Sequence, residues 1–180
     1  MEQYDSYLLQ ALATTGLISA LANTNYLDEK HFNELKFDNE SLKDIVKLSG
    51  IENPATLQMF LYALLVVPYE LNKNHELNMK FNELNQFIEK YIINSQSNYP
   101  DDKNGIKFVK HIRNSISHSK CSFNSNDSEC FITFFDHDDS RGRSYKCDFT
   151  IRTEDIGKLL EEIQFIIFDY FKNKYPDKCY

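Results

Sequence analysis

Apolar residues recur every three or four positions along most of this chain, which is the spacing of a helix that buries one face. The pattern predicts helices at about 4–24, 41–48, 54–67, 79–94, 105–120 and 153–172. Asn53 and Pro54 are residue types that begin a helix, and Pro68 is expected to kink or end that same helix. Thr153 is expected to cap the last helix, with two acidic residues favourably placed in its first turn.

A different pattern precedes the last helix. Phe131–Phe135 is rich in aromatic and β-branched residues, and apolar and polar residues alternate over Tyr145–Ile151, as in a strand with one solvated face. The polar residues 136–144 are expected to form the turn between these strands. The sequence therefore predicts a mainly α fold, an up-and-down helical bundle with a small antiparallel β-hairpin at about 121–152. With no linker or internal repeat in residues 1–180, a single domain is expected.

The composition is that of an ordinary globular protein. A hydrophobic share of 42%, a charged share of 26%, five Gly and four Pro exclude disordered, collagen-like and linker-dominated chains. The 27 acidic and 20 basic residues give a net charge of −7. This balance argues against a general nucleic-acid coat protein, because phosphate binding requires clustered Lys and Arg.

Neither a membrane span nor an export signal is predicted. The longest apolar run, Met59–Val67, is far shorter than the ~20 residues that a transmembrane helix requires. The segment Leu8–Ala22 is fairly apolar, but Glu2 and Asp5 precede it without any base, which is the wrong charge for a signal peptide. The expected location is the cytoplasm, with no membrane partner.

The cysteines support the same location. Their spacing matches no common zinc framework, and a chain of this length can rely on its core, so free thiols in a reducing compartment are expected for Cys121, Cys130, Cys147 and Cys179. A disulfide between Cys121 and Cys130 across a hairpin is the less favoured alternative.

Basic residues are concentrated in one segment. Lys103–Lys120 contains four Lys, one Arg and no acid, a charge of +5 that leaves −12 on the rest of the chain. Lys103, Lys107 and Lys110 have helical spacing, so three ammonium groups are expected on one side of a helix. A merely solvated face would explain such a run equally simply.

The same segment contains the string R-N-x-x-x-H, formed by Arg113, Asn114 and His118. This string, late in a helical bundle and flanked by Lys107, Lys110 and Lys120, resembles the HEPN family (higher eukaryote and prokaryote nucleotide-binding domains). The hairpin and long last helix look like a branch found in plasmid and phage-defence loci. The resemblance implies a metal-independent endoribonuclease that needs no cofactor and works as a homodimer with a composite active site. It assigns Arg113 and His118 as catalytic and Asn114 as a supporting polar residue.

The chemistry of these residue types suits RNA cleavage. Imidazole, with an unperturbed pKa of about 6.5, can remove a proton from the 2′-OH or supply one to the leaving 5′-oxygen. A guanidinium stabilises the charge that builds up on phosphate oxygens. Lys107, Lys110, His111 and Lys120 are the candidates for RNA contact.

Helical geometry separates two of the motif residues. Residues five apart lie about 140° around a regular helix, so Arg113 and His118 would not share a face, whereas Asn114 and His118 would. Either the helix is irregular there, or Arg113 serves a site shared with a second protomer. A surface histidine favoured by the helix C-terminus is the simpler alternative for His118.

Two further groups of residues are weaker candidates. His111 lies two turns before His118, about 10 Å along the axis, too far for both to bind one metal. It is a candidate for RNA contact, although an exposed position without function is expected more strongly. The run from Asp136 to Asp139 has a metal-binding composition but is expected to form the hairpin turn, so no metal site is predicted.

Three functions fit these observations. The first is an endoribonuclease that leaves a 2′,3′-cyclic phosphate, acting as a toxin or phage-defence effector with an antitoxin protein as partner. The second is a catalytically inactive HEPN-like module that binds nucleotide, RNA or protein. The third is a helical interaction protein with a coincidental motif. P-loop, G-x-S-x-G and H-E-x-x-H strings do not occur in the sequence, which disfavours the enzyme classes they define.

Overall fold

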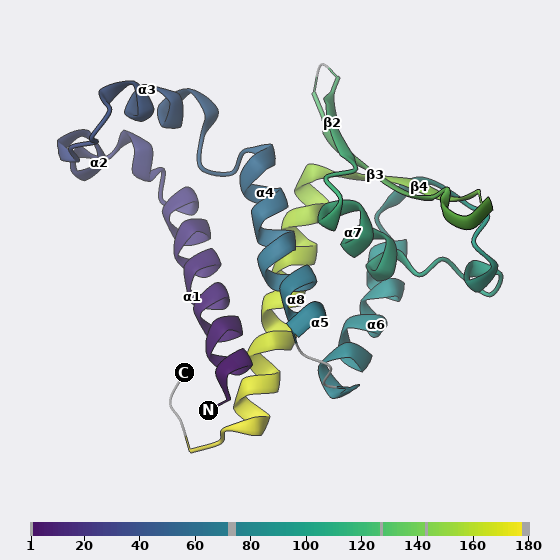
Figure 1. Ribbon diagram of the computed structural model, residues 1–180. Helices are drawn as coiled ribbons and strands as arrows, with labels where there is room; N and C mark the ends of the chain where they lie inside the picture. The colour runs from purple at the N-terminus through teal and green to yellow at the C-terminus, as the bar shows by residue number, and fades with distance from the viewer. Residues whose placement is uncertain (1, 72–74, 127, 143, 178–180) are drawn as a thin grey trace.

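The computed structural model describes residues 2–71, 75–126, 128–142 and 144–177. Its α-helices are α1 (Gln3–Asn23), α2 (Lys30–Glu34), α3 (Glu40–Ser49), α4 (Pro54–Leu61), α5 (Val67–Leu71), α6 (His75–Glu89), α7 (Phe108–Ser117) and α8 (Thr153–Lys174) (Figure 1). Single turns of 3₁₀-helix lie at Tyr26–Asp28, Pro100–Asp102 and Ser140–Gly142, and a π-helical turn at Tyr62–Val66 joins α4 to α5.

Within the described residues, no single helix is both long enough and apolar enough to cross a membrane. The helices Glu40–Ser49 and Pro54–Glu70 meet both criteria only when they are taken together, and they are bent by 86° relative to each other.

The expected helices are present, but several of them differ from the prediction at their ends or at a cap. The helix after Asn53 passes through Pro68 to Leu71, and the wide π-turn lies where proline leaves the carbonyl of Leu64 without its usual amide donor. The cap prediction for Thr153 is wrong, since Thr153 is the first helical residue and donates its hydroxyl to the carbonyl of Cys130 at 3.2 Å. The helix expected at 79–94 ends at Glu89.

The predicted small hairpin is wrong in extent, because the structure contains a four-stranded antiparallel sheet. The strands are β1 (Ile92–Ser97), β2 (Cys121–Ser125), β3 (Cys130–Asp138) and β4 (Tyr145–Arg152), in the order β1-β4-β3-β2. Strand β1 was expected to be the end of a helix and a loop. Its exposed, polar residues give no alternating pattern, and it is a strand because it pairs with β4 from Ile92 opposite Ile151 to Ser97 opposite Cys147.

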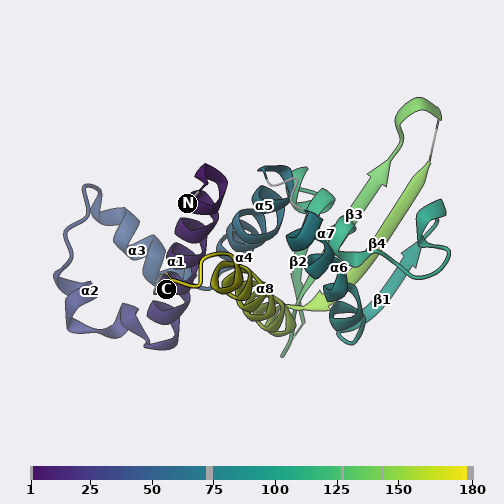
Figure 2. The same cartoon turned by 90° about the horizontal axis from the view of Figure 1, so that it is seen from below.

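One face of the sheet packs against the helices and forms the core. The inward residues alternate along β3 and β4 as Ile132, Phe134 and Asp136, and as Cys147, Phe149 and Ile151. Helix α7 lies on this face, where Phe108 contacts Phe149 edge to face with ring centroids 5.1 Å apart. Figures 1 and 2 show α6, α7 and the sheet at one end of the molecule and α2 and α3 at the other. The motif helix is therefore held directly by the sheet.

Candidate functional site

Helix α7 ends just before the histidine of the R-N-x-x-x-H string. The expected end was Lys120, but Ser119 adopts a left-handed φ of 53° and stops the helix. The amide of Ser119 donates to the carbonyl of Ile116 at 3.1 Å, and that of Lys120 to the carbonyl of Ser115 at 2.7 Å, which is a Schellman motif. His118 is thus the C-terminal cap of α7, and its side chain is exposed.

A cavity of about 580 Å³ opens beside His118, and we call it the His118 cavity. Lys110, Asn114 and His118 are spaced by four residues, so the helix presents them on the same side. The cavity is lined by Tyr99, Pro100, Asp101, Lys110, Asn114, His118, Lys120, Asp136, His137, Asp138 and Tyr145. The structure therefore brings together the candidate residues Lys110, Asn114, His118 and Lys120.

Arg113 lies in a second cavity of about 520 Å³, which we call the Arg113 cavity. Its guanidinium stacks on the ring of Tyr69, with Cζ 3.3 Å from the ring centroid. Lys107 and Val109 line this cavity, and Lys110 and Asp101 line both cavities. The prediction that Arg113 and His118 do not share a face of the helix is therefore confirmed, because the two residues line different cavities and Lys110 lines both.

The lysines of the basic segment are not arranged as the sequence pattern suggested. Helix α7 begins at Phe108, so Lys103 lies before it and Lys107 is its N-terminal cap residue. Three lysines therefore do not share one helix face. The exposed Lys120 follows the helix and donates its Nζ to the carbonyl of His137 at 3.1 Å.

His111 is fully buried, so its expected exposed position is wrong, and a ring with no exposed surface cannot contact RNA. Its Nδ1 atom lies 2.6 Å from Oδ2 of Asp136, and its Nε2 atom lies 2.8 Å from Oδ2 of Asp102. Asn114 donates its Nδ2 to the same Asp136 oxygen at 2.9 Å. A buried chain of polar groups therefore runs from Asp102 through His111 and Asp136 to Asn114, in the wall of the His118 cavity.

The pKa values of the two aspartates follow from these contacts. Burial by itself raises the pKa of Asp136, but hydrogen bonds from His111 and Asn114 outweigh burial, and the pKa is lowered. Burial also raises the pKa of Asp102 by itself. Hydrogen bonds from Ser97 and from the amide of Lys107, together with the contact with His111, outweigh burial, so the pKa of Asp102 is lowered. Both carboxyl groups are therefore charged acceptors.

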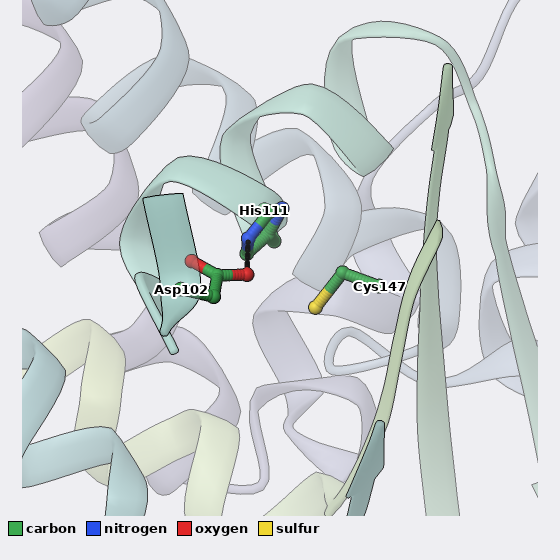
Figure 3. Close-up of side chains that lie close together, drawn as sticks. All are labelled: Asp102, His111 and Cys147. Atoms are coloured by element: carbon green, nitrogen blue, oxygen red, sulfur yellow. Dashed lines mark hydrogen bonds and ion pairs between the residues drawn. The ribbon is translucent and has the colours of Figure 1, made fainter. Parts of the chain in front are cut away.

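His111 and Asp102 also belong to a cluster of metal-ligand types with Cys147. Figure 3 shows Cys147 projecting from β4 toward the other two side chains, and the potential ligand atoms all lie within 4.8 Å of one another. Both ring nitrogens of His111, however, already contact carboxylates. Burial raises the pKa of the Cys147 thiol to about 12, so this sulfur is a protonated thiol at neutral pH. Because both ring nitrogens of His111 are engaged by carboxylates, the contacts within this cluster are those of a hydrogen-bonded network.

The residues from Asp136 to Asp138 belong to strand β3, so their assignment to a turn is wrong. Asp136 continues the inward row of Ile132 and Phe134, and this alternation is the sequence signal that would have found it. His137 points to the other face and lies 2.5 Å from Oδ1 of Asp148 through its Nε2 atom. No pattern in the sequence would have identified Asp102, because it lies in the 3₁₀ turn before α7 and comes close to His111 only in the folded chain.

Three cysteines lie within the described residues, and all three are free thiols. The hairpin of β2 and β3 places Cys121 opposite Phe134 and Cys130 opposite Ser125, so the two cysteines lie at opposite ends of the ladder. A disulfide between them is incompatible with this register. Cys179 lies outside the described residues.

A mainly helical domain with an R-N-x-x-x-H string at the end of a helix is the combination that resembles HEPN domains. The family model HEPN pEK499 p136 matches residues 1–174, and the chain belongs to this family of HEPN domains. No curated protein and no solved structure is significantly similar to the chain.

Proposed function

We propose that this protein is a metal-independent endoribonuclease that cleaves RNA by attack of the 2′-oxygen on the adjacent phosphate. The observation that carries the proposal is the exposed His118 at the end of α7, in a cavity that also contains Asn114, Lys110 and Lys120. Family membership supports it, because many HEPN domains are ribonucleases or nucleotide-binding modules.

The reaction requires one base and one acid. The neutral imidazole of one His118 accepts the proton of the 2′-OH while the 2′-oxygen forms a bond to phosphorus. The bond from phosphorus to the 5′-oxygen breaks, and a protonated imidazole donates a proton to this leaving oxygen. The products are a 2′,3′-cyclic phosphate and a free 5′-hydroxyl, so the atoms and protons balance without a metal ion.

A homodimer supplies the second imidazole. Each chain carries one R-N-x-x-x-H string, and a two-fold axis brings identical surfaces together. In such a dimer the two His118 side chains divide the roles of base and acid, and Arg113 stabilises phosphate charge across the interface. The separation of Arg113 and His118 into different cavities of one protomer favours this shared arrangement.

Lys110 and Lys120 are proposed to hold the phosphates of the RNA near His118, with Lys107 further along. Asn114 donates to Asp136 and lines the same cavity. The family resemblance extends the proposal to a toxin or phage-defence effector in the cytoplasm, restrained by an antitoxin protein.

The test compares RNA cleavage by the wild type with cleavage by Arg113→Ala and His118→Ala, each in EDTA. We expect the wild type to cleave and both variants to lose at least about 10²-fold in rate. His31→Ala is the matched control, since His31 is exposed on α2, outside both cavities. Intact RNA with the wild type, or cleavage by both variants at the wild-type rate, would overturn the proposal.

A binding module without catalysis is the second candidate function. The stack of Arg113 on Tyr69, away from His118, favours it if the protein is monomeric. Sedimentation at micromolar concentration distinguishes the two: a dimer supports the composite site, whereas a strict monomer that binds RNA without cleaving it supports the module.

A further inference from the structure

Part of the lining of the Arg113 cavity has no role in the proposed cleavage reaction. Three asparagines of α6, spaced by four and then three residues, face the basic side of α7 across this cavity. Its polar lining consists of Asn78, Asn82, Asn85, Asp101, Lys107, Lys110 and Arg113, together with the phenol ring of Tyr69. Its volume of about 520 Å³ falls in the ~300–1,000 Å³ range of sites for small ligands.

Two of the asparagine side chains are free to bind a ligand. Asn85 is engaged, because its Oδ1 accepts the amide of Val109 at 2.9 Å and so fixes α6 against α7. The amides of Asn78 and Asn82 have no hydrogen-bond partner among the described residues. Each of them offers a donor and an acceptor side by side, which is the pattern that the edge of a nucleobase matches.

Arg113 and Tyr69 provide a planar surface beside these amides. The guanidinium carbon lies 3.3 Å from the ring centroid, and a stacked guanidinium keeps its in-plane N–H groups available to a phosphate or a base. Unpaired bases of RNA bind by stacking on such planes and by hydrogen bonds to their exposed edges. Tyr69 is 40% exposed, so the stack is accessible to a ligand.

The cavity also has the charge that an RNA chain requires. Lys107, Lys110 and Arg113 supply three cations, and Asp101 is the one acid in the lining among the described residues. Asp101 lies 3.3 Å from Lys110 on the rim between the two cavities. A phosphate at Lys110 would thus connect a nucleotide in the Arg113 cavity with the scissile bond at His118.

We propose that the Arg113 cavity binds one unpaired nucleotide of the RNA substrate, next to the nucleotide that is cleaved, and selects its base through Asn78 and Asn82. This inference rests on the proposed function for the identity of the substrate. It adds a specificity site, in which Asn78 and Asn82 read the base and Lys107 holds a phosphate.

Binding measurements test the site separately from cleavage. The full-length His118→Ala protein is titrated into fluorescent hexaribonucleotides of A, C, G or U, and the anisotropy gives the affinity for each. We expect one base to be preferred, and we expect Asn78→Ala with Asn82→Ala to weaken its binding by about fivefold or more and to equalise the four affinities. Gln86→Ala is the control, since Gln86 is exposed on the same helix and does not line the cavity.

A phosphate contact leaves a different signature. Lys107→Ala should weaken all four oligonucleotides equally and reduce the slope of log affinity against log salt by about 0.7. Tyr69→Leu should weaken them by about fivefold or more through loss of stacking. Free nucleoside monophosphates should compete poorly, because they lack the neighbouring phosphate and nucleotide.

The outcomes separate the two proposals. A base preference that disappears in the asparagine variant supports the specificity site, even if the wild type cleaves no RNA and the ribonuclease proposal fails. Unchanged affinities and preference in that variant, absence of RNA binding, or competition by a monophosphate as strong as by the hexamer would each overturn the specificity site. Unchanged affinities in the asparagine variant, or strong competition by a monophosphate, leave the ribonuclease proposal standing, because wild-type cleavage is measured on its own. Absence of RNA binding would count against both proposals.

Discussion

The Nδ1 atom of His111 lies 2.6 Å from Oδ2 of Asp136, in a buried contact that joins helix α7 to strand β3. The same oxygen accepts the side-chain amide of Asn114, so one carboxylate anchors two turns of the helix. This contact determines how Asn114 and, one turn later, His118 lie relative to the sheet. Its strength is therefore the first property to measure.

Replacing Asp136 by Ala leaves a buried imidazole and the Asn114 amide without their acceptor. Removing one partner of a buried pair typically costs ~3–5 kcal/mol, and we expect a loss of unfolding free energy of about 3 kcal/mol in urea titrations. Glu129→Ala is the control, because its ion pair with Arg152 is exposed and should be worth about 1 kcal/mol or less. Equal losses in the two variants would contradict the anchoring role.

The free energy of unfolding should fall at acid pH because of Asp102 and Asp136. The pKa values of Asp102 and Asp136 are lower in the folded than in the unfolded protein, so their stabilising contribution is fully present above the unfolded value of about 3.9. It is lost as the pH falls from there through the folded values. Urea midpoints of wild type and Asp136→Asn, measured from pH 7 down to pH 2, should differ by a constant amount above about pH 4 and draw together below it. A difference that stays constant over the whole range would show that Asp136 is not charged in the folded state.

Ser115 is buried in α7, and its hydroxyl has no hydrogen-bond partner within the described part of the chain. An unpaired buried hydroxyl costs free energy that an apolar side chain avoids. Ser115→Ala should therefore raise the unfolding free energy by about 1 kcal/mol in urea titrations. Ser117→Ala is the comparison, because Ser117 is exposed and its hydroxyl donates to the carbonyl of Arg113; a stabilisation equal to that of Ser115→Ala would reflect helix propensity alone.

Thiol reactivity should differ sharply between strands. Cys130 is exposed, whereas Cys147 is buried with a pKa of about 12 and has almost no thiolate at neutral pH. Iodoacetamide followed by peptide mass mapping should modify Cys130 in the native protein and Cys147 only in denaturant. Rapid native alkylation of Cys147 would mean that the sheet opens on this side.

Asp5 joins the two ends of the described chain. It is buried and lies 2.7 Å from Nζ of Lys174, and it also accepts the hydroxyl of Tyr175 at 2.6 Å. Lys174→Met should cost about 2 kcal/mol or more of unfolding free energy, because it leaves a buried carboxylate without its cation. Lys30→Met breaks only the exposed pair with Glu34 and should cost a few tenths of a kcal/mol. If the Lys174 variant is as stable as the Lys30 variant, the ion pair between Asp5 and Lys174 does not stabilise the fold.

The positions of the helices, and the side of α7 that Lys110, Asn114 and His118 share, could be predicted from the spacing of residues. The four-residue spacing of Lys110, Asn114 and His118 is a property of any helix, and it places all three in one cavity. The five-residue spacing of Arg113 and His118 likewise places them on different faces of a helix. Strand β1 was not predictable, because its side chains are mostly exposed and only its pairing with β4 makes it a strand.

The environment of His111 could not be predicted from local sequence patterns. His111 lies three residues after Phe108 and next to Ile112, so helical spacing places it at the edge of the apolar face, but its partners are not visible in the local sequence. Its two carboxylate partners come from a 3₁₀ turn before the helix and from a strand after it.

By itself, the sequence determined the helices, the R-N-x-x-x-H string and the local excess of positive charge, because these depend on neighbouring residues and on helical spacing. Only the tertiary structure decided that the sheet has four strands and that His111 lies in the core between Asp102 and Asp136. Such features depend on hydrogen bonds and burial between segments distant along the chain. They form only when folding excludes water from between those segments.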